Sequence, residues 1–456
     1  MASTTYLQRT VSTTGSRRKA TFSAWIKKSG QGEQWFLNSG GNNSTGYNIK
    51  IGFGSTDEIF IINSSGSTNL RYQTTRLLRD NNSWYHIVVA LDTENSTSGD
   101  RVKVYINGNR ETSFFNVTTP SQNLDLEMNQ NTSSKNLMAI GTRYNSGDLF
   151  NGLMSHVQWI DGTAYDASAF GSTDSVTGEW QINTSPSVTY GTNGFFILKD
   201  GNSVTDQSGQ SNNLTVGGGT LTKTEDCPSN VFATLNPLAS LPNTGVSTFT
   251  NGNTTSQGVN GSYVNGGSNL QMSSGKWYAE CKYIATSSDV GRMIIGITQD
   301  VSEISRINQD TGSYNTYLNN YDGAGAKSVQ GSNPSSYGNA YGVNDIIGIA
   351  LDLDNEKLYF SINGTWQNSG VPTSGSTGTG AITGFSSPSS SISGGYFFFS
   401  GSNSNAQNNT VSWNFGNGYF GTTAVSSAGT NASGNGIFEY DCPAGFTALS
   451  TKGLNL

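Results

Sequence analysis

The sequence predicts an all-β protein built from two antiparallel sandwiches in tandem, and three observations lead to this fold class. The 456 residues are enough for two or three domains. Only 12% of the residues are charged, whereas Ser, Thr, Asn, Gly, Tyr and Phe are frequent, which is typical of strands and turns. No stretch places apolar residues at the spacing of an amphipathic helix, so two-layer sandwiches accommodate the chain best.

Strands are expected wherever apolar and polar residues alternate. In chain order, clear alternation occurs at residues 21–27, 101–106, 357–362 and 410–415. Clusters of Gly, Asn, Asp and Ser separate these segments and supply the residues that turns require. The alternation therefore extends over both halves of the chain.

Two hairpins of similar composition occur, one in each half. In the first half, an apolar strand ending at Asp92 is followed by a second strand that leads into Asn107-Gly108. In the second half, an apolar strand ending at Asp352 is followed by one that leads into Asn363-Gly364. Asn-Gly favours tight two-residue hairpins. Duplication and independent use of the same hairpin chemistry both explain the similarity.

The boundary between the two sandwiches is expected within residues 215–262. A run of three glycines opens this region, three of the nine prolines follow, and residues 243–262 are rich in Asn, Thr, Ser and Gly. We therefore expect a first sandwich at 1–225, a linker at 226–262, and a second sandwich at 263–456 that ends in a C-terminal tail.

Charge, cysteines and hydropathy exclude several classes of function. A net charge of −7 disfavours nucleic-acid binding, and residues 358–438 contain no charged side chain, so surfaces there must recognise partners through neutral groups. The three cysteines, Cys227, Cys281 and Cys442, cannot all pair within one chain and suggest free thiols formed in a reducing cytoplasm. The polar N-terminus shows no signal peptide, and no apolar stretch is long enough for membrane insertion.

At these strands and hairpins the sequence resembles two known families. Residues 84–92 and 104–108 resemble the laminin-G/concanavalin A-like lectin fold, a jelly-roll sandwich. The second half resembles a SPRY domain at residues 275–280, 345–352, 358–364 and 411–416. The resemblance implies a concanavalin A-like sandwich followed by a SPRY-like sandwich.

Three further segments are similar to phrases in lectin-plus-SPRY virion proteins of tailed bacteriophages, notably marine ones: residues 190–196, 232–238 and 443–449. This resemblance implies a virion structural protein on the particle exterior, as a tail fibre, receptor-binding appendage or head decoration. It also implies contact with host surface glycans, capsid or tail proteins as partners, and a homo-oligomer such as a trimer. A soluble glycan-binding lectin or adhesin is the alternative.

No catalytic residue is assigned. Glycosidases of concanavalin-like fold need two carboxylates on one strand face, and their Glu-x-Asp-x-x-Glu pattern is absent. The acidic groups of residues 352–356 fall on a predicted turn, and the other close pair is Asp125 and Glu127. His86 and His156 lie in alternating apolar strands and are expected to pack rather than act as bases. The sequence thus predicts a non-enzymatic protein, with a depolymerising glycosidase least favoured.

No metal ligand is assigned either, although calcium stays open. Laminin-G-like domains often hold calcium at the sandwich rim through a carboxylate and carbonyl oxygens. Asp92, Asp100, Asp148 and Asp161 fall near predicted loops, but none lies in an acidic cluster of the Asp-x-Asp-x-Asp-Gly type. No other cofactor is expected.

Two groups of side chains are candidates for binding. The first is aromatic and lies among Asn, Ser and Gly, which suits stacking on sugar rings; its members are Tyr314, Tyr317, Tyr321, Tyr337, Tyr341 and Trp366. The alternative is that these rings are half-buried strand residues. The second group, Arg17, Arg18 and Lys19, is either a solvated face or a docking contact for an acidic partner such as a capsid surface.

Overall fold

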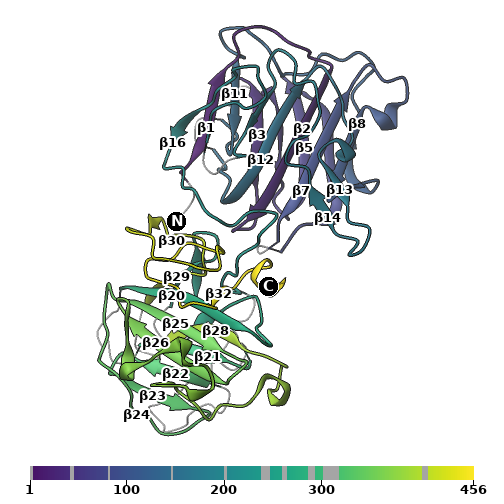
Figure 1. Cartoon of the computed structure of the whole chain (residues 1–456). Helices are drawn as coiled ribbons and strands as arrows, with labels where there is room; N and C mark the ends of the chain where they lie inside the picture. The colour runs from purple at the N-terminus through teal and green to yellow at the C-terminus, as the bar shows by residue number, and fades with distance from the viewer. Residues whose placement is uncertain are drawn as a thin grey trace. The chain divides into compact units, whose positions relative to one another are not determined.

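The computed structural model describes residues 4–41, 46–80, 83–144, 147–199, 203–237, 247–258, 264–285, 293–300, 318–402 and 409–455. The chain divides into two compact units, Met1–Lys223 and Thr224–Leu456 (unit 1 and unit 2; Figure 1). Each unit is built from antiparallel sheets, which confirms the predicted fold class. Among the described residues, no helix has the length and hydropathy that crossing a membrane requires.

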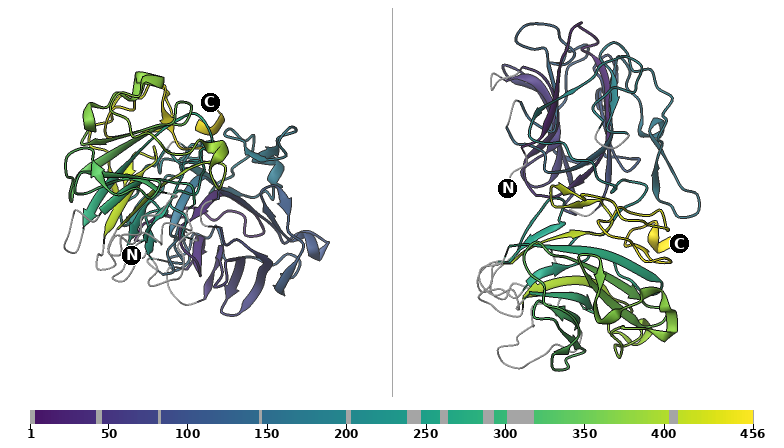
Figure 2. Two further views of the ribbon diagram at one scale, coloured as in Figure 1. Left: turned by 90° about the horizontal axis from the view of Figure 1, so that it is seen from below. Right: turned by 60° about the vertical axis from the view of Figure 1, so that its left-hand side comes forward.

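Unit 1 is a sandwich of an eight-stranded and a six-stranded sheet, whose two layers are visible in Figure 2. The larger sheet runs in the order β10 (Phe114–Thr118), β6 (Thr68–Leu77), β5 (Glu58–Ser65), β4 (Tyr47–Phe53), β3 (Gln34–Gly40), β11 (Leu137–Ile140), β1 (Tyr6–Thr10) and β16 (Thr215–Gly218). The smaller sheet runs in the order β15 (Phe195–Ile197), β12 (Gly152–Asp161), β2 (Lys19–Lys28), β7 (Tyr85–Asp92), β8 (Val102–Ile106) and β9 (Asn109–Arg110).

The alternation of side chains fills the space between these two sheets. Ile51 and Ile61 of the larger sheet and Phe22, Val89 and Trp159 of the smaller sheet are fully buried in one core. Because successive strand residues point to opposite faces, every second side chain of the larger sheet faces away from this core. A separate hairpin of β13 (Gly171–Thr173) and β14 (Trp180–Ile182) carries Trp180, which packs against His86.

Unit 2 has the same two-layer construction. Its eight-stranded sheet contains β17 (Thr248–Thr250), β18 (Thr255–Gln257), β29 (Thr410–Asn414), β20 (Lys276–Ala285), β25 (Ile346–Asp352), β26 (Lys357–Ile362) and β27 (Thr365–Trp366), with β32 (Thr447–Ala448) pairing β20. The six-stranded sheet runs β19 (Val264–Gly267), β28 (Phe397–Ser402), β21 (Met293–Thr298), β22 (Leu318–Asp322), β23 (Ala326–Val329) and β24 (Ser335–Ser336), and β30 (Tyr419–Phe420) pairs β31 (Thr423–Ala424).

Both Asn-Gly hairpins form as the sequence predicts. Asn107 and Gly108 have φ of 48° and 78°, and Asn363 and Gly364 have φ of 47° and 79°. These positive angles are those of the tight turn that matches strand twist. In both hairpins the asparagine side chain also accepts a backbone N–H from the first strand. His86 N donates to Asn107 Oδ1 at 2.8 Å, and Ile346 N donates to Asn363 Oδ1 at 2.9 Å.

The segments predicted as a linker and a tail are part of unit 2. Phe232, Ala233 and Leu235, from the predicted linker 226–262, are buried, and β17 and β18 from the same segment extend the eight-stranded sheet. Near the C-terminus, Phe446 and Leu449 are buried and β32 pairs with β20. These polar-looking segments pack because each contributes a few large apolar side chains to the core of unit 2.

Candidate functional site

The aromatic group predicted to bind sugars is mostly buried. Tyr314 and Tyr317 lie outside the described residues. Tyr321, Tyr337 and Tyr341 are 0%, 6% and 2% exposed and pack on one another, with ring centroids 5.4 Å apart for Tyr321 and Tyr337 and 5.2 Å apart for Tyr321 and Tyr341. A ring inside the core cannot stack on a sugar, so the expectation of an exposed aromatic surface is corrected for these three tyrosines.

The hydroxyl groups of the buried tyrosines explain how they fit among polar neighbours. Tyr321 donates to the carbonyl oxygen of Asn339, and Tyr341 lies 3.1 Å from the carbonyl oxygens of both Met293 and Tyr321. Burial raises the pKa of Tyr341 well above its ordinary value. Trp366 in β27 is half-buried and packs edge-on against Tyr278 and Tyr359.

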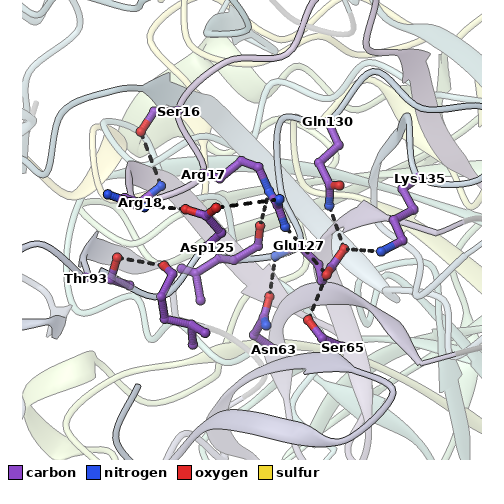
Figure 3. Close-up of polar contacts among 12 residues, drawn as sticks. Ser16, Arg17, Arg18, Asn63, Ser65, Thr93, Asp125, Glu127, Gln130 and Lys135 are labelled. Carbon is purple, nitrogen blue, oxygen red and sulfur yellow. Dashed lines mark hydrogen bonds and ion pairs between the residues drawn. The ribbon is translucent and has the colours of Figure 1, made fainter. Parts of the chain in front are cut away.

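The basic cluster predicted for docking is neutralised by carboxylates of the same unit. Arg18 Nε lies 2.7 Å from Asp125 Oδ1, and Arg17 lies 3.6 Å from Glu127 (Figure 3). Lys19 Nζ lies 2.7 Å from Glu94 Oε2. Arg17 Nε also donates to the carbonyl oxygen of Leu126 at 3.0 Å. The contacts of Arg17 and Arg18 fasten residues 125–127 to the start of β2, and Lys19 is paired with Glu94. The cluster therefore stabilises the fold and carries little unpaired positive charge.

Glu127 is the central acceptor of this cluster. Its carboxylate accepts hydrogen bonds from Ser65 Oγ at 2.7 Å and Gln130 Nε2 at 2.6 Å, and it pairs with Lys135 at 3.1 Å (Figure 3). Although burial acts to raise it, these donors hold the pKa of Glu127 below its ordinary value. Asn63 accepts the backbone N–H of Glu127 at 2.8 Å, which fixes this chain segment from the other side.

His86 has a packing role. Its ring is stacked between Trp25 and Trp180, with centroids 5.0 and 5.9 Å away, and it is 1% exposed. Trp180 Nε1 donates to Nδ1 at 2.9 Å, so Nε2 carries the proton and donates to Ser23 Oγ at 3.0 Å. Burial, reinforced by His156, lowers the pKa of His86 to about 3, which keeps the ring neutral.

The four aspartates considered for calcium lie in separate places. Asp100 and Asp148 form ion pairs of 2.7 and 2.8 Å with Arg110 and Arg143, and Asp92 lies 3.9 Å from Lys19. Asp161 accepts hydrogen bonds from Ser16, Asn129 and Asn193. Within the described ranges, no group of three or more His, Cys, Asp or Glu side chains could hold a metal ion.

A polar cavity of about 610 Å³ lies at one edge of the larger sheet of unit 1 (the edge cavity). β1 and β16 form its floor together with the start of β11 and residues 211–213. Apart from the charged Arg9, its side chains are mainly neutral amides and hydroxyls, among them Gln8, Thr10, Asn136 and Thr215.

Arg9 is held in place at this cavity by neutral oxygens. Its guanidinium donates to Asn212 Oδ1 at 2.5 Å and to the carbonyl oxygen of Asn193 at 3.4 Å. Asn193 is fixed in turn, because its backbone and side-chain N–H groups donate to Asp161 at 3.0 and 3.1 Å. Burial lowers the pKa of Arg9, while Asp206 and Asp161 oppose this shift.

The loop that lines one side of the cavity through residues 211–213 is organised by Asp206. Its carboxylate accepts the backbone N–H groups of Phe196, Ser208 and Asn212, each at 2.8 Å. Asn212 then donates to the carbonyl oxygens of Thr192 and Gly194 at 2.9 and 2.7 Å. In the described part of the chain, the side chains of Gln8 and Asn136 make no hydrogen bond, so their amides are available to a ligand.

Sequence patterns could not reveal this cavity. Arg9, Asn136 and Asn212 are far apart in the chain and come together only because β1 pairs with both β11 and β16. Isolated Asn, Gln and Thr residues are also frequent throughout this composition and give no local signal.

Comparison with known families finds one match in each unit. Residues 2–170 match the family model of the concanavalin A-like lectin/glucanases superfamily, and residues 276–398 match the model of the SPRY domain. The predicted resemblance to these two families is therefore confirmed. No curated protein matches the chain.

Solved structures with partial similarity include the SPRY domain of human HERC1, with a TM-score of 0.28, 12% identity, and coverage of 39% of this chain and 96% of that chain. A heptameric SAP-like pentraxin from Limulus polyphemus gives a TM-score of 0.26 and 16% identity, covering 35% and 71% of the two chains. A putative carbohydrate binding protein from Bacteroides ovatus gives a TM-score of 0.31 and 16% identity, and the similarity covers 46% of this chain and 57% of that chain.

Proposed function

We propose that this chain is a non-enzymatic glycan-binding protein whose edge cavity in unit 1 holds a neutral saccharide. The observation that carries the proposal is the lining of this cavity, beside Arg9, mainly by amides and hydroxyls, in the unit whose residues 2–170 match a lectin superfamily. Amides and hydroxyls both donate and accept hydrogen bonds, as the hydroxyl groups of a sugar do. A rigid site made of such groups binds at low entropic cost.

The state of the carboxylates supports the absence of catalysis. A glycosidase needs one carboxylic acid and one free carboxylate on either side of the scissile bond. The carboxylates behind the edge cavity, Asp161 and Asp206, are each surrounded by N–H donors and hold the backbone in place. Asp352, from the predicted acidic turn, is buried and pairs with Lys276 at 3.1 Å.

A glycan array probed with the full chain tests the binding proposal. We expect neutral glycans to bind, and we expect Asn136→Leu to abolish this binding because it replaces an available amide by an apolar side chain of nearly the same shape. Asn109→Leu is the matched control, since Asn109 is an exposed asparagine of β9 on the other sheet. Binding by wild type and both variants alike would contradict the assignment of the site. Release of shorter glycans would contradict the absence of catalysis.

We further propose that the protein is displayed on the exterior of a virion, attached to capsid or tail proteins, as a tail fibre, receptor-binding appendage or head decoration. The similarity of residues 190–196, 232–238 and 443–449 to phage virion proteins supports this role. A homo-oligomer such as a trimer would present several edge cavities at once and raise avidity for host glycans. Cryo-electron microscopy of particles that lack the protein is expected to show the loss of an external feature, and unchanged particles would refute the proposal.

A further inference from the structure

The outer face of the larger sheet in unit 1 carries a second group of side chains with binding chemistry. Cross-strand pairing places Asn38 of β3 beside Lys50 of β4, Lys50 beside Ile62 of β5, and Ile62 beside Arg71 of β6. Paired residues of neighbouring strands point to the same side of a sheet. This row therefore lies on one face, opposite to the face that carries Ile51 and Ile61 into the core.

Each cation of this face lies over an aromatic ring. Lys50 Nζ is 4.7 Å from the centroid of the Trp35 ring, and the Arg71 guanidinium is 5.5 Å from that of Phe60. Arg143, which follows β11, lies 4.7 Å from the ring of Tyr144. We call Trp35, Asn38, Lys50, Phe60, Arg71 and Arg143 the cationic face. Because cations occupy the ring faces, this surface offers positive charge instead of an open ring for a neutral sugar.

The positive charge is only partly compensated. Arg143 pairs with Asp148 at 2.8 Å and lies 4.0 Å from Glu33, whereas Lys50 and Arg71 form no ion pair with any described residue. Glu58, on the same side of β5, has its carboxylate engaged by Gln73 at 2.7 Å and Thr56 at 2.8 Å. Burial lowers the pKa of Lys50 to about 8, and repulsion from Arg143 contributes to the shift.

Several polar atoms of the cationic face are buried without a partner. Both amide atoms of Asn38 make no hydrogen bond in the described structure, and the Asn38 residue is 0% exposed. The Nε atoms of Arg71 and Arg143 are also buried and unpartnered. These atoms have almost no solvent exposure, so the partly exposed side chains of Lys50 and Arg71 are the groups of this face that a ligand can reach.

We propose that the cationic face binds a carboxylated polysaccharide, at a site separate from the edge cavity. Guanidinium groups match the planar geometry of a carboxylate and hydrogen-bond to it through two N–H groups. Lys50 and Arg71, which are partly exposed and form no ion pair with any described residue, are the groups that a carboxylate would meet on this surface. A chain of uronic acid units presents both a carboxylate and hydroxyls on each sugar.

The test is a binding titration of the full chain with polygalacturonate, with uncharged dextran as the neutral comparison and dextran sulfate as the sulfated one. We expect polygalacturonate to bind, dextran not to bind, and dextran sulfate to bind more weakly than polygalacturonate. Lys50→Gln and Arg71→Gln should each weaken polygalacturonate binding by about tenfold or more. The matched control is Lys199→Gln, since Lys199 also lies over a ring, that of Phe196 in β15 of the other sheet.

A conservative variant keeps the test independent of folding. Lys50→Arg retains the charge and should retain binding. Wild-type affinity should fall as the pH is raised from 7 to 9, because Lys50 loses its proton there, and the fall should be smaller in Lys50→Arg. The charged groups that face Lys50 are Arg143, Arg71, Glu33 and Asp148.

Three outcomes would overturn the proposal. These are equal binding of dextran and polygalacturonate, stronger binding of dextran sulfate than of polygalacturonate, and unchanged affinity in both Lys50→Gln and Arg71→Gln. Because Asn136→Leu affects only the edge cavity, it should leave polygalacturonate binding intact. The proposals for the edge cavity and for the cationic face can therefore be refuted independently of each other.

Discussion

Buried side chains with polar ends determine much of the packing of unit 2, and Tyr321 shows this most clearly. Its ring contacts Tyr337, Tyr341 and Phe360 inside the core, and its hydroxyl group donates to the carbonyl oxygen of Asn339. We predict that Tyr321→Ala destabilises unit 2 by roughly 3–5 kcal/mol, because it leaves a cavity the size of an aromatic ring. Urea unfolding of the full chain measures this effect.

Trp366→Ala provides the comparison for Tyr321→Ala. Trp366 is half-buried at the end of the sheet, so its removal should cost less stability than that of Tyr321. If Tyr321→Ala left stability unchanged while abolishing glycan binding, Tyr321 would be a surface residue and its placement in the core would be wrong.

The sequence of β22 explains why these tyrosines were predicted to form an exposed binding surface. All five residues of β22 are buried, yet the strand reads Leu-Asn-Asn-Tyr-Asp, with more polar than apolar side chains. Tyrosine carries both an apolar ring and a polar hydroxyl, so it suits a core and a sugar-binding surface equally well. Only the packing around Tyr321 and its hydroxyl partner distinguishes these cases.

Glu280 is a fully buried carboxylate of unit 2. It accepts the backbone N–H groups of Glu439 and Tyr440 at 2.8 and 2.9 Å, together with Asn414 Nδ2 at 3.1 Å. Burial nevertheless raises its pKa to about 7 in the folded chain, above the ordinary value of 4.5. The stabilisation linked to the bound proton is therefore complete below pH 4.5 and is lost as the pH rises through about 7.

Replacing Glu280 by glutamine tests this linkage. We predict that the melting temperature of unit 2 falls between about pH 5 and pH 8 in the wild type and changes less in Glu280→Gln, which has no proton to lose. Tyr278→Phe is the control, since it removes one hydroxyl donor and keeps the carboxylate. Equal slopes in wild type and Glu280→Gln would show that the carboxylate does not bind a proton in this window.

At the scale of elements, sequence reasoning works where side chains alternate and fails where they do not. The segments 21–27, 101–106, 357–362 and 410–415 coincide closely with β2, β8, β26 and β29. By contrast, β17 and β18 have the sequences Thr-Phe-Thr and Thr-Ser-Gln. Short polar strands of this kind are fixed by pairing with a neighbour and not by their own pattern, since β17 pairs with β18 and β18 pairs with β29.

The C-terminal segment illustrates an element whose role depends on its partners. Phe438, Phe446 and Leu449 are buried, β32 pairs with β20, and backbone N–H groups of residues 439 and 440 bind Glu280. We predict that ending the chain after residue 435 unfolds unit 2 and leaves unit 1 folded. Loss of one of two calorimetric transitions would show this, whereas retention of both would mean that the segment is a dispensable tail.

At the scale of the whole molecule, the two compact units should respond to pH in opposite directions. In unit 1, burial lowers the pKa of His86 from 6.5 to about 3, so the stability linked to the neutral ring is lost as the pH falls below about 6.5. In unit 2, burial raises the pKa of Glu280, so the stability linked to its bound proton is lost as the pH rises. Acidification from pH 8 to 5 should thus lower the unit 1 transition and raise that of unit 2.

Differential scanning calorimetry of the full chain measures both transitions. Tyr321→Ala assigns them, because it should lower only the unit 2 transition. His86→Phe should flatten the pH dependence of unit 1 and leave that of unit 2 unchanged. A parallel shift of both transitions with pH would contradict the assignment of these two buried groups.

The central claim is that unit 1 recognises a neutral glycan through its edge cavity, and hydrogen–deuterium exchange with and without a saturating array-selected glycan tests it most directly. The claim predicts that the glycan slows exchange around residues 8–12, 136–137 and 211–215, which surround the cavity, and that Asn136→Leu removes this protection. Protection confined to unit 2, or spread over unit 1 but absent from these three segments, would contradict it.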